Sequence, residues 1–171
     1  MRLEDEIKQK EFKDVYQKAH INLIYTNYKL EYLFKSFFSS FDLTQQQYNV
    51  LRILRGAKEQ PVTVLYIRER MLDKMCDASR IVERLRLKKL VSRKVNKIDR
   101  RHVDINITKE GLALLEKIDN DILELQEIMK SITEEEANVL NLLLDKLREA
   151  SDLVLQKKKP ILSVLDHENE D

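Results

Sequence analysis

The sequence contains few of the residues that interrupt or cross-link a chain. Its 171 residues include two glycines, two prolines, one cysteine and no tryptophan. With charged residues at 36%, this scarcity excludes turn-rich all-β folds and favours long charged helices. A single cysteine excludes an intrachain disulfide. Apolar residues make up 43% of the chain, which is enough for the core of one compact domain.

Long apolar runs are also missing. No stretch approaches the roughly 20 residues that a membrane span requires. The first ten residues, MRLEDEIKQK, are too charged for a secretory signal. We therefore expect a soluble cytoplasmic protein that does not associate with membranes.

Helical periodicity dominates the N-terminal part. Apolar residues at intervals of three and four predict one helix from about Leu3 to Phe41, too long to bury its apolar stripe without a partner. Thr44 and Gln47 form a predicted capping box that starts a second helix. Gly56 is expected to end that helix.

Two shorter helices are expected next, separated by a tight turn. The first covers about residues 64–71 and is capped by Thr63, and the second runs from Asp77 to Lys88. Such a pair is a candidate helix-turn-helix.

The period then changes from helix to strand. Leu90 to Val95 and Val103 to Ile107 alternate apolar and polar residues around a charged tip, which predicts a β-hairpin. Thr108 caps a predicted helix whose apolar positions continue to Met129.

Thr133 and Glu136 form a second predicted capping box, and the helix that it starts is expected to reach about Leu155. The remaining residues resemble a loosely ordered tail. The predicted organisation is an N-terminal dimerisation helix (1–41), a helix-turn-helix with a hairpin wing (42–108), C-terminal dimerisation helices (109–156) and a tail (157–171).

Positive charge is concentrated in one segment. Residues 80–102 contain ten basic and two acidic residues, a local net charge of +8, whereas the whole chain has a net charge of +1. The predicted second helix and hairpin are the elements that a winged helix-turn-helix presents to DNA. The near-zero net charge of the whole chain therefore results from acidic residues elsewhere, which cancel this positive charge.

The stretch from Leu43 to Gly111 resembles the MarR (multiple antibiotic resistance regulator) family of bacterial transcription factors. The most specific part is Asp99-Arg100-Arg101, followed by the alternating strand and by Thr108 with an early glycine. The resemblance implies a mainly α fold with a small β-hairpin wing, in which long dimerisation helices flank the winged helix-turn-helix.

The resemblance also implies roles for individual residues. Arg101 would enter the minor groove while Asp99 orients its guanidinium; the alternative is a simple ion pair across the hairpin tip. Asp77 is favoured as a helix cap over a base contact. The candidate DNA-binding residues are Asp77, Ser79, Arg80, Arg84, Lys97, Arg100 and Arg101.

Three positions depart from the family pattern. Leu72 and Lys89 stand where the family often has glycine, so the backbone at both turns is in question. Arg68 replaces a small residue, and the sequence leaves open whether it reaches a phosphate or lies on the surface.

These observations predict a homodimeric regulator, most simply a repressor, that binds an inverted-repeat operator and responds to a small aromatic or anionic effector. Tyr16, Tyr25 and Tyr28 are candidate effector contacts, although dimer core is the stronger interpretation for each. A helical protein-interaction module without DNA binding is the alternative. No phosphate loop, nucleophile–base pair or metal-ligand spacing is present, so we expect no enzyme, cofactor or metal. Cys76 is interpreted as a small residue rather than a redox sensor.

Overall fold

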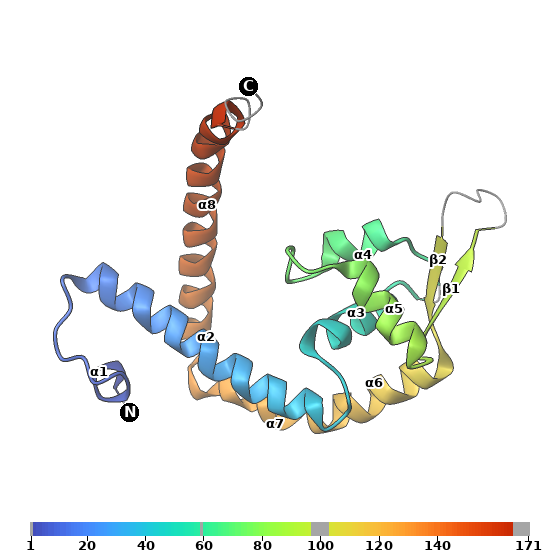
Figure 1. Cartoon of the computed structure of the whole chain (residues 1–171). Coiled ribbons are helices and arrows are strands. Elements are labelled where there is room, and N and C mark those ends of the chain that lie inside the picture. The colour runs from blue at the N-terminus through green and yellow to red at the C-terminus, as the bar shows by residue number, and fades with distance from the viewer. Residues whose placement is uncertain (1, 59, 97–102, 166–171) are drawn as a thin grey trace. The chain divides into compact units, whose positions relative to one another are not determined.

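Helices dominate the structure. The computed structural model describes residues 2–58, 60–96 and 103–165, and it divides into two compact units, Met1–Ile122 and Leu123–Asp171, each described by itself. The elements of the first unit are α1 (Leu3–Glu6), α2 (Val15–Ser39), α3 (Gln45–Gly56), α4 (Val64–Arg70), α5 (Ala78–Leu87), β1 (Val91–Val95), β2 (Val103–Ile107) and α6 (Lys109–Asp121) (Figure 1). The second unit contains α7 (Leu123–Gln126), a 3₁₀ helix (Glu127–Ser131) and α8 (Glu134–Leu165).

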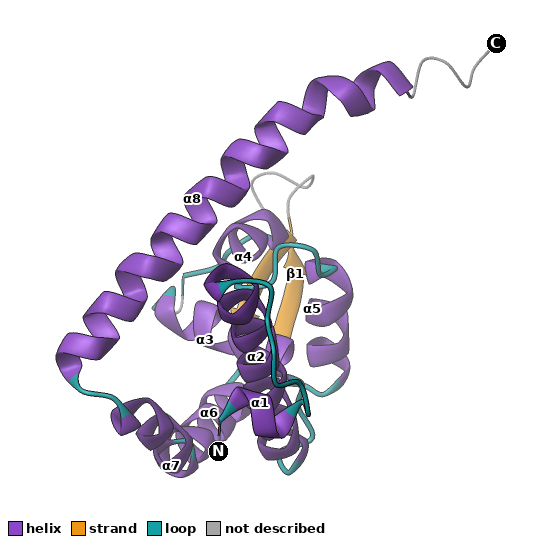
Figure 2. Cartoon of the chain, turned by 90° about the vertical axis from the view of Figure 1, so that its left-hand side faces the viewer, coloured by secondary structure: helices purple, strands orange, loops and turns teal. Residues whose placement is uncertain are grey.

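The predicted fold class, mainly α with a small β-hairpin, is confirmed (Figure 2). Hydroxyl and carboxylate side chains start the helices as their sequence positions indicate. In the capping box at the start of α3, the Gln47 backbone N–H donates to Thr44 Oγ1 at 3.2 Å and the Thr44 N–H donates to Gln47 Oε1 at 3.0 Å. The second predicted box forms in the same way between Thr133 and Glu136. Each box satisfies two N–H groups that a helix start would otherwise leave without partners.

The hydrophobic core lies in the winged part of the first unit, between α3, α4, α5, β2 and α6. Burial of each large apolar side chain stabilises the fold by about 1.5–3 kcal/mol. The end of α2 joins this core through Phe38, whose ring centroid lies 4.5 Å from that of Tyr48. Five fully buried residues represent the five core elements: Leu51, Ile67, Leu85, Ile105 and Leu115.

The two strands pair as the predicted antiparallel hairpin. Val91 is opposite Ile107, and Val95 is opposite Val103. Val62, in the loop before α4, exchanges backbone hydrogen bonds of 3.1 and 2.9 Å with Ile105. This bridge ties the hairpin to the chain that leads into the helix pair.

The prediction of one helix from Leu3 to Phe41 is wrong. Helix α1 ends at Glu6, and α2 begins only at Val15, where Asp14 Oδ1 accepts a hydrogen bond from the Gln17 N–H at 2.8 Å. Lys8 has a left-handed φ of 54°, which turns the chain back. In this arrangement Leu3 is only 7% exposed.

The helix that starts after Thr108 also stops earlier than its periodicity predicts. It ends at Asp121, and the chain continues as two short helical segments. Met129 is exposed there, so packing that would hold a longer α-helix is missing. A tighter 3₁₀ turn at such a helix end is common.

The last helix is longer than predicted, because α8 continues past Leu155 to Leu165 and includes Pro160. A proline removes one helical N–H, but its fixed φ is compatible with a helix. The predicted tail is therefore partly helical, and residues 166–171 lie outside the described residues. Within the described chain, no helix is both long and apolar enough to cross a membrane.

Candidate nucleic-acid interface

Helix α5 is fixed at its start by Asp77. The Arg80 backbone N–H donates to Asp77 Oδ1 at 3.0 Å, which makes Asp77 the N-cap. The predicted capping role is confirmed. This bond satisfies one of the backbone N–H groups that a helix start leaves without a partner. The exposed side chains that follow it are arginines and a serine.

The outer face of α5 is basic. Ala78, Val82 and Leu85 are buried against the core, whereas Arg80 and Arg84 are exposed one turn apart. No ion pair holds either guanidinium among residues 2–58, 60–96 and 103–165. These two side chains are therefore available to an anionic partner.

Glu83, the one acidic residue within α5, is neutralised by its neighbours. Arg86 Nε donates to both carboxylate oxygens at 3.1 and 3.0 Å, and Arg86 Nη2 donates at 2.7 Å. Arg93 Nη1, on β1, lies 3.8 Å from the same carboxylate. The hydrogen bonds from Arg86 hold the pKa of Glu83 below its usual range. Glu83 therefore opposes an approaching phosphate less than an isolated carboxylate would.

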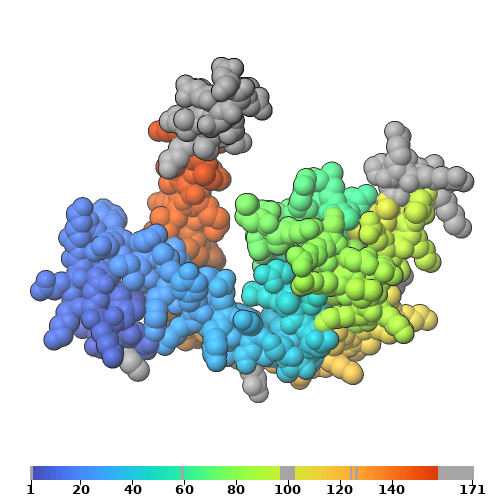
Figure 3. Space-filling view, viewed as in Figure 1, coloured from blue at the N-terminus to red at the C-terminus, as the bar shows by residue number. Residues whose placement is uncertain are grey.

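The hairpin continues the basic surface of α5. Arg93 and Lys94 are exposed on β1, and α5 and the hairpin form one continuous surface in the space-filling view (Figure 3). At the base of the tip, Asn96 Nδ2 donates to the Asp104 carboxylate at 3.0 and 3.1 Å. The predicted wing contacts Lys97, Asp99, Arg100 and Arg101 lie outside the described residues, so their roles stay predictions.

The exit from α5 depends on a lysine in a left-handed conformation. Lys89 has φ 62°; its N–H donates to the Arg86 carbonyl at 2.9 Å, and the Leu90 N–H donates to the Leu85 carbonyl at 3.0 Å. This is the Schellman pattern, which usually places glycine at this position. The Lys89 carbonyl then accepts from Thr108 Oγ1 at 2.8 Å, which links the helix exit to the start of α6.

The second position where glycine is common in the family behaves differently. Leu72 is not among the residues with positive φ, and its N–H donates to Asn49 Oδ1 at 3.1 Å. The turn between α4 and α5 therefore needs no glycine. Only Lys89, of these two positions, carries backbone strain.

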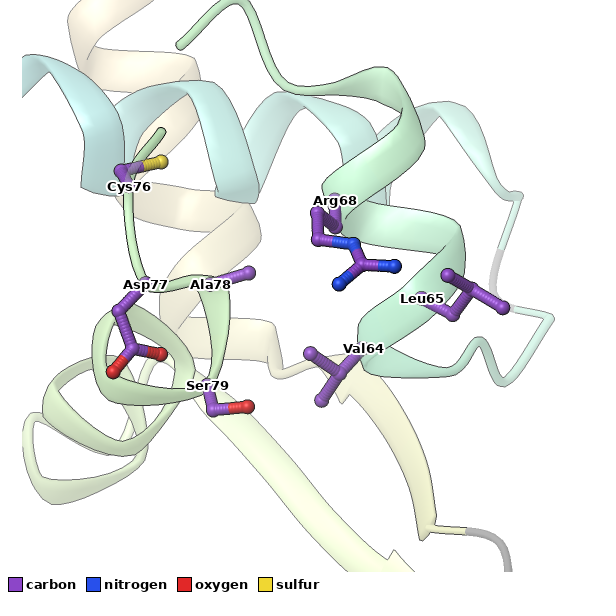
Figure 4. Close-up of a pocket in the computed structure, with 7 residues that line it drawn as sticks. All are labelled: Val64, Leu65, Arg68, Cys76, Asp77, Ala78 and Ser79. Atoms are coloured by element: carbon purple, nitrogen blue, oxygen red, sulfur yellow. The ribbon is translucent and has the colours of Figure 1, made fainter. Parts of the chain in front are cut away.

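A cavity of about 290 Å³ opens between α4 and the start of α5. Figure 4 shows the Arg68 guanidinium in this space, together with the side chains of Val64, Ala78 and Ser79. The sequence alone offers no basis for placing Arg68. Its position four residues after Val64 on a short helix brings it opposite α5.

A second cavity, of about 620 Å³, lies where the last turn of α5 meets the turn between α2 and α3. It is lined in part by Arg84, Thr44 and Lys88. Lys88 Nζ lies 2.8 Å from Asp42 Oδ2 and also donates to the Asp42 carbonyl. This ion pair connects the end of α5 to the turn that follows α2.

Solved structures with this arrangement include bacterial transcription regulators. A MarR transcription factor from Planctomyces limnophilus is 28% identical, with a TM-score of 0.59 over 84% of this chain and 98% of that one. A cysteine-to-serine mutant of MarR from E. coli, complexed with operator DNA, is 26% identical, with a TM-score of 0.64 over 86% and 99%. BpsR from Bordetella bronchiseptica is 22% identical, with a TM-score of 0.62 over 76% and 98%. No family model and no curated protein sequence matches the chain.

The chain has the winged-helix fold of MarR transcription regulators. The resemblance noted in the sequence is thereby confirmed, and the matched structures are transcription regulators rather than enzymes. In MarR-type terms, α5 is the recognition helix and the hairpin of β1 and β2 is the wing.

The tyrosines predicted as effector contacts lie on α2 of this MarR-type fold. Tyr16 and Tyr28 are 81% and 65% exposed. Tyr25 is half-buried, and its hydroxyl donates to the Glu6 carboxylate, which raises the pKa of Tyr25. None of the three lines either cavity beside the recognition helix. Their role in effector binding stays a prediction.

Cys76 lies just before the recognition helix. Its thiol donates to the Asp73 carbonyl at 2.9 Å, and burial raises the pKa of Cys76, with Asp73 and Asp77 adding to the effect. A redox sensor is favoured by a stabilised thiolate, and a raised pKa disfavours that form of Cys76. Within the described part of the chain, no cluster of three or more His, Cys, Asp or Glu could hold a metal ion.

Proposed function

We propose that this MarR-type protein is a sequence-specific DNA-binding regulator of transcription that works in the bacterial cytoplasm. The observation that carries the proposal is the pair of exposed guanidiniums of Arg80 and Arg84, which no described carboxylate neutralises. Arginine recognises guanine edges and phosphates through two parallel hydrogen bonds. The operator DNA bound by the E. coli relative supports the same assignment.

The wing would add contacts beside the recognition helix. Arg101 inserts into the minor groove and Asp99 orients it, while Lys97 and Arg100 contact phosphates. The exposed Arg93 and Lys94, at the base of the wing, add positive charge along the same path. Ser79, exposed in the first turn of α5, lies among the residues of the helix start that face the DNA.

The protein would bind as a homodimer. On α2, Tyr16 and Tyr32 are 81% and 78% exposed, and on α8 Leu147 and Leu155 are 57% and 58% exposed. Exposed apolar surface of this kind is typical of protein interfaces. A twofold dimer would place two recognition helices about 34 Å apart, so the operator would be an inverted repeat.

Regulation would act through the spacing of the two recognition helices. The ion pair between Lys88 and Asp42 couples the end of α5 to the turn after α2, so a displacement of α2 would move α5. We propose a repressor that a small aromatic or anionic molecule releases, with Tyr16, Tyr25 and Tyr28 as candidate contacts. In BpsR, 6-hydroxynicotinic acid regulates DNA binding, which supports an effector of this class.

Selection of bound fragments from genomic DNA, followed by gel shift, tests the proposal. The wild-type protein should enrich a small set of fragments that share an inverted repeat. Arg84→Glu and Arg101→Glu should each abolish the shift. Lys117→Glu is the matched control, because Lys117 is exposed on α6 and the charge change is the same.

A protein-interaction module on the same fold makes a different prediction. The wild-type protein would then enrich no common sequence, and Arg84→Glu would behave like Lys117→Glu. That result would reject the DNA-binding proposal in favour of the alternative.

A further inference from the structure

The groove between α4 and α5 contains an arginine, Arg68, that has no ion-pair partner among the described residues. Arg68 is exposed, and no described carboxylate forms an ion pair with its guanidinium. The cavity that it enters is lined on the α5 side by Ala78 and Ser79. One guanidinium and one hydroxyl therefore face a common space that is open to solvent.

The acidic residue at this cavity is already engaged. Asp77 contributes to the lining, but Oδ1 accepts the Arg80 N–H. Figure 4 shows its carboxylate directed away from Arg68, whereas the Ser79 hydroxyl points toward the α4 side. The groove thus presents donors to a visiting anion. Val64 and Leu65 form an apolar wall beside them, which would strengthen a charged hydrogen bond.

The size and position of the site suit a phosphodiester of the DNA backbone. In a helix-turn-helix, the first helix crosses the backbone while the second enters the major groove. Arg68 is on α4, the first helix of the pair, and it shares the groove with the start of α5, the second helix. We propose that Arg68 and Ser79 together bind one backbone phosphate, which fixes the angle at which α5 enters the major groove.

This inference rests on the proposed DNA-binding function. In it, Arg68 positions the protein on the DNA and does not read the base sequence. Phosphate contacts set register and orientation, and they carry no base information. Removal of the Arg68 side chain should therefore lower affinity for selected and scrambled duplexes by a similar factor. Removal of the Arg84 side chain, in contrast, should lower affinity for the selected duplex more than for the scrambled one.

The test measures affinity against salt concentration for a duplex of about 30 base pairs, roughly three helical turns, taken from the genomic selection. Arg68→Ala should reduce the slope of log affinity against log salt by about 0.9 for each phosphate that is no longer neutralised, hence by about 1.8 for a dimer. Arg68→Lys should keep the slope while lowering affinity, since the charge remains and the planar fork is removed.

Arg70 provides a matched control on the same helix. Its guanidinium lies 3.5 Å from the Tyr66 ring centroid, and Nη1 donates to the Tyr66 carbonyl at 3.2 Å, so the protein already holds it. Arg70→Ala should leave the slope unchanged. Circular dichroism melts of all variants establish that each is folded at the assay temperature.

A second measurement locates the phosphate. Duplexes that carry a single neutral methylphosphonate should show one position per half-site where wild type loses affinity and Arg68→Ala does not. If wild type binds but Arg68→Ala keeps its full slope, or shows the same methylphosphonate pattern, this inference is overturned and the proposed function stands. If wild type binds no duplex, both are overturned.

Discussion

The carbonyl oxygen of Leu90 occupies the space that a side chain on Gly111 would need. A Cβ at Gly111 would lie 2.3 Å from that oxygen and 2.8 Å from Ile107 Cγ1. The same carbonyl accepts the Thr108 N–H at 3.1 Å. This close approach holds the start of α6 against the first residues of the wing, so the position of the hairpin depends on the absence of a side chain here.

Gly111→Ala should therefore destabilise the protein. Backbone must move to admit the methyl group, and overpacking of this kind costs about 1–3 kcal/mol. Gly56→Ala is the control, because a Cβ there meets nothing within 4 Å. Within a helix, that change should be neutral or stabilise by about 0.5–1 kcal/mol. Urea unfolding at one fixed protein concentration measures both, and equal effects of the two changes would contradict the close-contact argument.

Lys89→Gly should stabilise the protein, because the left-handed backbone at Lys89 costs a non-glycine residue about 1–2 kcal/mol. The Schellman hydrogen bonds stay intact in the variant. Leu72→Gly should give no such gain and should destabilise the protein by about 0.5–1 kcal/mol through chain entropy. Thermal melts at equal protein concentration report both changes. A lower melting temperature for Lys89→Gly would show that its side chain, not its backbone, determines stability at the helix exit.

Attachment of the N-terminal segment to α2 should depend on pH. Lys29 and Tyr25 donate to Glu6, which lowers the pKa of Glu6 below its ordinary 4.5 and raises the pKa of Lys29 above 10.5. The Glu6 contribution is complete above pH 4.5 and is lost as pH falls through its lowered value; the Lys29 contribution is complete below pH 10.5 and is lost as pH rises. Attachment should therefore be strongest between these limits.

Glu6→Gln mimics the acid form at neutral pH. Hydrogen exchange in residues 3–7 should become faster than in wild type, whereas Glu11→Gln, which alters an exposed residue outside the described ion pairs, should have no effect. Unchanged exchange in Glu6→Gln would mean that burial of Leu3 and the ion pair between Glu4 and Lys18 hold the segment without Glu6.

Leu147→Glu should weaken the proposed dimer. Leu147 is 57% exposed in the single chain, and burial of a leucine at an interface is worth about 1.5–3 kcal/mol, so the dissociation constant should rise about tenfold or more. Lys146→Glu changes the neighbouring exposed residue and serves as the control. Sedimentation velocity over a concentration series reports the monomer fraction. Identical behaviour of the two variants would place the dimer interface elsewhere.

Local rules of sequence predict most of the fold. Thr44, Thr63, Thr108 and Thr133 each mark a helix start, because a hydroxyl before an apolar period satisfies a free N–H. Helix ends are harder to predict. The break at Lys8 depends on what Leu3 gains by folding back, which is tertiary information and absent from a local pattern.

The residues of the candidate site likewise divide into those that the local sequence predicts and those that depend on tertiary structure. Asp77, Arg80 and Arg84 follow from helical spacing, since the buried face of α5 fixes the exposed one. Arg68 could not be placed, because its neighbour across the groove is on another helix. The pairing of Glu83 with Arg93 likewise requires the β1 position that only the fold supplies.

The most direct test of the central claim, that the outer face of α5 reads DNA, is the affinity ratio between the selected duplex and a scrambled one. Wild type should prefer the selected duplex by about 10³-fold or more. In the double variant with Arg80→Ala and Arg84→Ala, the loss of each arginine–base contact should cost about 1–3 kcal/mol of binding free energy on the selected duplex. The affinity ratio should therefore fall strongly. An unchanged ratio in the double variant would contradict the account.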